Sequence, residues 1–188
     1  MKKLIIPTLF SVILLALSSP AQAQIKLESN GFGPIRLGSV ISKLPKSADG
    51  IYDCIDKVVI SAEMSMDDFD TIEYHIKSKG EDIAILTEFE GKIYSMDIVS
   101  TKLVSPSGLS LNTTASQLLD KGAKTHCDNS GYVGLVINGF LFRDMDLSKS
   151  GQKKAEIAYL DGSDQVFNKT DYVSGTKPKR ITIAEWYR

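Results

Sequence analysis

The chain has 188 residues, 24% of them charged, and its 22 basic and 23 acidic residues leave a formal net charge of −1. A nucleic-acid-binding protein is expected to carry a basic face or stripe. Here the two signs are interspersed and no basic run is longer than KPKR at 177–180. The composition therefore argues against a nucleic-acid partner.

Residues 1–23 have the layout of a secretory signal peptide. Lys2 and Lys3 precede the apolar stretch LIIPTLFSVILLAL, and small residues follow it, ending in AQA at 21–23. This order predicts cleavage after Ala23. The alternative is an N-terminal membrane anchor, but the apolar run is shorter than the ~20 residues that a spanning helix needs. We expect a periplasmic or secreted protein without a stable membrane anchor after cleavage.

The stretch GPIRLGSVISKLPK at 33–46 predicts a short strand that leads into a short helix. Ile35 and Leu37 alternate with other residues as in a strand, and Ser39 fits a helix start. Pro45 ends the helix because proline cannot continue the hydrogen-bond ladder.

A second stretch, SGLSLNTTASQLLDK at 107–121, repeats this pattern. Leu109 and Leu111 alternate in the same way, and Thr114 and Gln117 have the spacing of a capping box. We therefore expect a second short helix that begins after Thr114 and ends near the glycine at 122.

Three strands are expected after each helix. In the first half they are TIEYHIKS at 71–78, DIAILTEFE at 82–90 and KIYSMDIVS at 92–100; in the second half they are YVGLVINGFLFRD at 132–144, KAEIAYLD at 154–161 and RITIAEWY at 180–187. The pattern predicts an α+β fold of two tandem helix-plus-three-strand units, 24–103 and 104–188. Together they would form one antiparallel sheet with the short helices packed on one face.

The repeated step into a short helix, IRLGSVISKL in one half and LSLNTTASQL in the other, resembles the β-lactamase-inhibitory-protein fold and its relative, a small outer-membrane-assembly lipoprotein. The resemblance covers most of the mature chain in layout. It implies a non-catalytic binder or scaffold. The chain has no cysteine at the cleavage site for lipidation, and no contact residues of the inhibitors match one by one, so none is carried over.

Cys54 and Cys127 each follow one predicted helix. In an oxidising compartment two such cysteines usually form a disulfide, and we expect one between them. A zinc site with His75 and His126 is the first alternative, but adjacent His126 and Cys127 are poorly spaced for one ion. A catalytic thiol with His126 as its base is the second. The disulfide is favoured, with no metal and no cofactor.

Two groups of carboxylates are further candidate sites. Asp67, Asp68 and Asp70 lie close together, but the stretch lacks the glycine and distal glutamate of an EF-hand loop. Glu88 and Glu90 lie two apart, which places them on one face of a strand. We expect both groups to face solvent.

The segment 161–179 interrupts the repeat in the second unit, and irregular loops of this length are often functional. Within it, Phe167, Asp171, Tyr172 and Lys177 are the candidates for contact with a partner.

The leading hypothesis is an exported, non-catalytic module that binds a protein partner through a sheet face and this loop. The alternatives are a small metal- or thiol-dependent enzyme and a carrier of a small molecule or lipid.

Overall fold

The computed structural model describes residues 24–61, 70–127, 132–163 and 165–185. The predicted signal peptide at 1–23 and the acidic residues Asp67 and Asp68 lie outside the described residues. No helix in the described ranges is long and apolar enough to cross a membrane.

The described chain is an α+β protein, as expected, and most of its regular elements are strands. In chain order the elements are β1 (Ile25–Glu28), β2 (Gly31–Phe32), β3 (Ile35–Arg36), the 3-10 turn η1 (Ile41–Lys43), β4 (Cys54–Ile60), β5 (Thr71–Ser78), β6 (Glu81–Phe89), β7 (Lys92–Ile98), β8 (Leu103–Val104), α2 (Ala115–Asp120), β9 (Lys124–Cys127), β10 (Val133–Ile137), β11 (Phe140–Arg143), α3 (Lys149–Asp161), the 3-10 turn η2 (Lys169–Asp171) and β12 (Arg180–Ala184).

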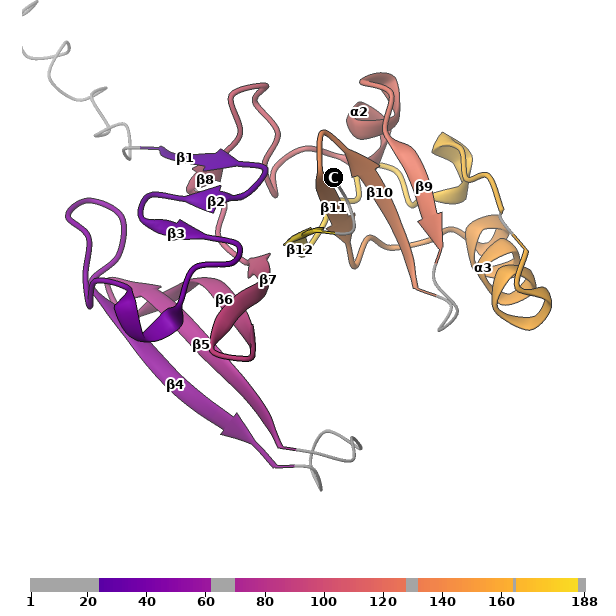
Figure 1. Ribbon diagram of the computed structural model, residues 1–188. Helices are drawn as coiled ribbons and strands as arrows, with labels where there is room; N and C mark the ends of the chain where they lie inside the picture. Colours follow the sequence, from indigo (N-terminus) through magenta and orange to yellow (C-terminus); the bar gives the residue numbers. More distant parts are fainter. Residues whose placement is uncertain (1–23, 62–69, 128–131, 164, 186–188) are drawn as a thin grey trace, which may run out of the picture.

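The main sheet has eight antiparallel strands in the order β4-β5-β6-β7-β12-β11-β10-β9. Each half of the chain contributes four of them, one more than the sequence predicts. In chain order, the four strands of each half begin at an outer edge of the sheet, with β4 or β9. They end at the centre of the sheet, where β7 pairs with β12 (Figure 1). The strand order is therefore mirrored about the junction of β7 and β12.

The three strands predicted in the first half are confirmed as β5, β6 and β7. Two-residue turns connect them, and both residues of each turn have positive φ: 56° and 79° at Lys79 and Gly80, 51° and 76° at Glu90 and Gly91. Such turns match the right-handed twist of a hairpin. Glu90 therefore lies in a turn and does not share a strand face with Glu88.

The predicted strand at 154–161 is wrong, because these residues form the second half of α3. The Ser148 side chain caps this helix by accepting from the Gly151 amide, and Gly162 closes it with a φ of 61°. The short run KAEIAYLD fits both the two-residue period of a strand and the 3.6-residue period of a helix. The caps on either side of it favour the helix.

The two predicted helices have different outcomes. The helix expected from Ser39 is only the one-turn η1, because Pro45 holds Leu44 in an extended conformation with ψ of 141°. The second helix is confirmed as α2, and the capping box between Thr114 and Gln117 is formed in both directions.

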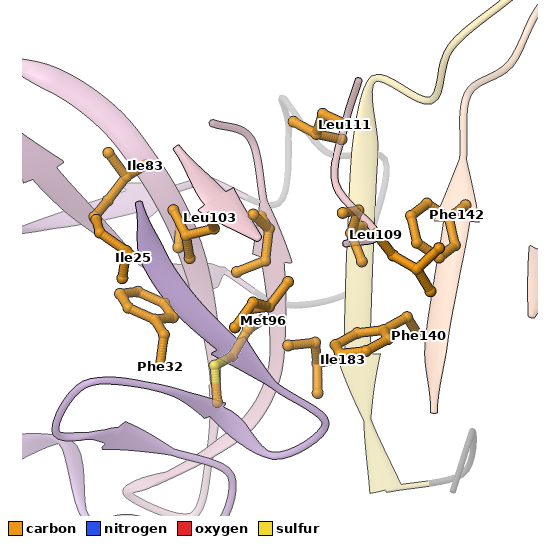
Figure 2. Packing of buried hydrophobic residues seen from close by; sticks show 14 of the residues in the cluster. Ile25, Phe32, Ile83, Met96, Leu103, Leu109, Leu111, Phe140, Phe142 and Ile183 are labelled. Atoms are coloured by element: carbon orange, nitrogen blue, oxygen red, sulfur yellow. The ribbon is translucent and has the colours of Figure 1, made fainter. Parts of the chain in front are cut away.

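One core runs through both halves on the same face of the main sheet. In the first half it is covered by a small sheet in the order β3-β2-β1-β8, and in the second half by α2 and the segment before it (Figure 1). Met96 and Ile183 face each other where the halves meet, and neither is exposed. Figure 2 shows this continuity from Phe32 and Leu103 on one side to Leu109 and Phe142 on the other.

Candidate functional site

The structure separates the two cysteines. Cys54 begins β4 and Cys127 ends β9, and these are the two outermost strands of the eight-stranded sheet. Seven steps of about 4.8 Å put them about 34 Å apart along the sheet, whereas a disulfide needs a Cα spacing of about 5.5 Å. The expected Cys54–Cys127 bond is wrong, and the two do not form a disulfide.

The surroundings of Cys54 do not favour a nucleophile, and His126 does not share a face of the sheet with Cys127. Burial, followed by the charges of Asp56 and Asp53, raises the pKa of Cys54, which disfavours the reactive thiolate. His126 and Cys127 are consecutive in β9, so their side chains point to opposite faces of the sheet. The pair that the sequence offers as base and thiol is therefore not brought together.

His75 lies on β5 between two carboxylates. Its Nδ1 is 2.9 Å from Asp82 and its Nε2 is 3.3 Å from Glu73. In the described part of the chain, no group of three or more histidine, cysteine or acidic residues has an arrangement that holds a metal ion.

The contact residues expected in the loop 161–179 are mostly buried. Phe167 is 2% exposed, Tyr172 4% and Asp171 1%. This placement corrects the expectation that these three face a partner. Lys177 is exposed, and its ammonium group is 3.4 Å from the Asn112 side-chain oxygen.

The Asp171 carboxylate joins this loop to α3. It accepts hydrogen bonds from Lys154 at 2.7 Å, Ser150 at 2.8 Å and the Asn168 amide at 2.9 Å. Burial acts to raise the pKa of Asp171, but these hydrogen bonds outweigh it and hold the pKa below its ordinary value. The loop is therefore a structural support for the second half of the sheet.

What this loop supports is the outer edge of β9. The Phe167 amide donates to the Thr125 hydroxyl at 3.2 Å, and Lys169 forms an ion pair with Asp120 at the end of α2. The segment that follows α3, drawn next to β9 in Figure 1, therefore contacts this strand. Such covering is a common way for proteins to protect the unpaired backbone groups of an edge strand.

The opposite edge, β4, has no such cover among the described residues. It is a seven-residue strand that pairs only with β5 there, and Val58 and Val59 are 38% and 54% exposed. Figure 1 shows the β4–β5 hairpin projecting away from the rest of the sheet. A long edge of this kind presents a row of backbone donors and acceptors that another strand can pair with.

A groove of about 710 Å³ runs beside β4 on the core side of the sheet. Its lining combines the η1 segment with the β4–β5 hairpin: Ile41, Ser42, Leu44, Lys46, Asp53, Cys54, Ile55, Lys57 and Tyr74. Two smaller hollows, of about 530 and 340 Å³, have mainly polar residues and glycines in their linings. The β4 edge and this groove, which we call the β4 groove, form the candidate binding site.

Tyr74 forms part of the groove and is fixed in place. Its hydroxyl donates to Glu88 at 2.6 Å. This hydrogen bond, together with burial, raises the pKa of Tyr74 to about 12, so the hydroxyl stays protonated at neutral pH. Tyr74 therefore contributes an uncharged aromatic side chain to the groove wall.

This site is not predicted from the sequence, because β4 is not predicted. The stretch CIDKVVI is rich in β-branched residues, which is a strand signal. Its valines occupy adjacent positions, so they do not alternate with polar residues. The neighbouring η1 segment is predicted as part of a helix, and that prediction hides its role as a groove wall.

The architecture is that of an α+β protein with two half-sheets joined into one antiparallel sheet. No protein-family model matches the chain, and a search of curated proteins gave no match. Among solved structures, the chain is similar to the crystal structure of the uncharacterized protein yfeY from Escherichia coli. The identity is 13%, the TM-score is 0.51, and the match covers 85% of this chain and 99% of that one. This likeness concerns the fold.

Proposed function

We propose that the chain is an exported, non-catalytic protein-binding module that adds an extended segment of its partner to the open edge of β4. The proposal rests on the difference between the two edge strands of the main sheet, β4 and β9. In the second half the 161–179 loop contacts β9 through the hydrogen bond from Phe167 to Thr125, whereas β4, the other edge strand, is long and has no such cover among the described residues.

Strand addition suits this geometry physically. Backbone hydrogen bonds to an edge strand provide affinity that is independent of the partner's sequence, while pockets for alternate side chains provide specificity. The β4 groove lies beside the edge where such side chains would enter. The resemblance to β-lactamase-inhibitory proteins, which are binders and not enzymes, also supports a binding role. The signal-peptide layout of residues 1–23 supports export.

The second candidate is a carrier of a small molecule. The volume of the β4 groove falls within the roughly 300–1,000 Å³ of small-ligand sites. A carrier is expected to enclose its ligand, however, and this groove is open along the exposed edge of β4.

The test uses the purified mature chain, residues 24–188, and a library of displayed linear peptides. Peptides that bind are synthesised, and amide hydrogen exchange is measured with and without each one. The proposal predicts slower exchange in β4 and no change in β9. Binders that slow exchange only elsewhere, for example around Phe89 and Tyr94, would show that another surface is the binding site.

A further inference from the structure

The chemistry of the partner segment can be inferred from the side chains of β4, and this inference rests on the proposed function. Ile55 pairs with Ile76 and Lys57 pairs with Tyr74, so both β4 residues point to the core side of the sheet. The row that begins at Lys57 continues through buried Leu86, Met96 and Ile183. Lys57 is thus a charged residue at the outer end of an apolar row.

The described lining of the β4 groove carries two ammonium groups, those of Lys46 and Lys57, and one carboxylate, that of Asp53. No ion pair in the described ranges involves Lys57 or Lys46, although the neighbouring Lys77 is paired with Asp56 at 2.8 Å. Asp53 is the one acidic residue in the described lining, and its carboxylate accepts from the Lys79 amide in the β5–β6 turn. The groove therefore offers two ammonium groups beside apolar side chains.

A strand added at β4 would place its side chains in register with these groups. Neighbouring strands lie about 4.8 Å apart, and alternate side chains share one face. Directly opposite residues are the ones that interact most strongly, and opposite charges are favourable there. One side chain of the added strand would lie beside Ile55, and the side chain two positions along would lie beside Lys57.

We propose that the β4 groove recognises an extended protein segment in which an acidic residue stands two positions from an apolar one. The acidic group meets Lys57 and Lys46, and the apolar group packs beside Ile55 and Leu44.

A second copy of this chain fits the site less well. On the core side β4 carries Ile55, Lys57 and Val59, with no acidic residue. Pairing of two β4 edges about a twofold axis would bring lysines to the same face without a counter-charge, which is unfavourable. The charge of the groove thus favours an acidic partner over self-association.

The test uses two synthetic eight-residue peptides with the mature chain. In one, valine and glutamate alternate along one face and threonine fills the other; in the second, lysine replaces glutamate. The variants are Lys57→Glu and Lys46→Glu, and the matched control is Lys124→Glu, an exposed lysine on the opposite edge strand. Binding is measured by fluorescence anisotropy at low and high salt, and hydrogen exchange locates each peptide.

The wild-type chain is expected to bind the acidic peptide about tenfold more tightly than the basic one, from two charge pairs. Lys57→Glu should reverse this preference, and Lys124→Glu should leave it unchanged. Equal binding of both peptides at β4 would overturn the acidic-partner inference while the proposed function stands. If neither synthetic peptide binds and no library peptide slows exchange in β4, both the inference and the proposed function are overturned. Both are also overturned if sedimentation shows a dimer and hydrogen exchange shows that β4 is protected in it.

Discussion

At the scale of single residues, Asp171 shows how one buried carboxylate orders a long loop. The side chain is 1% exposed, yet three hydrogen bonds satisfy it, one of them from the Lys154 ammonium group. A buried carboxylate is tolerated only when it is paired in this way. The sequence could not show this, because an acidic residue in a polar loop is usually exposed.

Replacing Asp171 by asparagine should therefore destabilise the fold. Asp171→Asn keeps the shape but removes the charge that Lys154 faces, and we expect the free energy of unfolding to fall by about 2 kcal/mol. Urea unfolding at pH 7, followed by circular dichroism, measures this. The control is Asp161→Asn at the exposed end of α3, which should change stability by less than about 0.5 kcal/mol. Equal effects of the two substitutions would contradict the role given to Asp171.

The same carboxylate should make stability depend on pH. Because its pKa in the folded state is lowered, its stabilising contribution is complete above the unfolded pKa of about 3.9 and is lost as the pH falls below that value. The difference between wild type and Asp171→Asn should thus be constant from pH 7 to 5 and shrink towards pH 3. Unfolding curves across this range measure it, and a difference that persists undiminished at pH 3 would be the opposite result.

The positions of the cysteines predict ordinary thiol behaviour. Protein purified without reductant should show two reactive thiols per chain after denaturation, and reductant should not change the melting temperature. In the native state at pH 8, Cys54 should be alkylated more slowly than free cysteine, because its pKa is raised. A cross-linked peptide joining Cys54 to Cys127 in mass spectrometry would contradict the strand order itself.

At the scale of elements, the close contact between α3 and the loop that follows it depends on Gly151. A Cβ atom at this position would lie 2.0 Å from the Asp171 carbonyl oxygen, which is a backbone atom and cannot move freely. The helix can approach the Asp171 backbone this closely because Gly151 has no side chain. This contact holds α3 against the loop that contacts β9.

Gly151→Ala should therefore lower stability by about 2–4 kcal/mol and increase hydrogen exchange in β9. The control is Gly162→Ala at the other end of α3, where the new methyl group would have no described atom within 4 Å and only the φ of 61° is unfavourable. That change should cost about 1 kcal/mol. If Gly151→Ala destabilises the protein without exposing β9, the loop is not the cover of that edge.

The elements that could be predicted are those with local signals. In β5 apolar residues alternate with polar ones in the sequence, glycine turns join β5 to β7, and α2 carries its own capping box. The helix α3 is not predicted, because its apolar residues do not form a clear helical stripe. The strand β4 is not predicted, because its exposed Val58 and Val59 are adjacent. Burial of Phe167 depends on contacts with distant residues, which no local pattern contains.

At the scale of the whole molecule, the mirrored strand order explains both the failed disulfide and the candidate site. Cys54 and Cys127 hold similar places in the repeated sequence pattern, which favours a contact between them. Because the halves join through their last strands, their first strands become opposite edges of one sheet. The same strand order makes β4 and β9 the two edges of the sheet. Within the described residues, the 161–179 loop contacts β9, and no such segment covers β4.

Residue-resolved amide exchange by NMR tests this account most directly, with the chain of residues 24–188 measured free and bound to the acidic peptide. Strand addition predicts that exchange slows at every second amide between Cys54 and Ile60, because alternate backbone groups of an edge strand point outward. The amides of β9 should be unaffected. Unchanged exchange throughout β4 while the peptide is bound, or slowing confined to residues outside it, would contradict the claim that this open edge is the binding site.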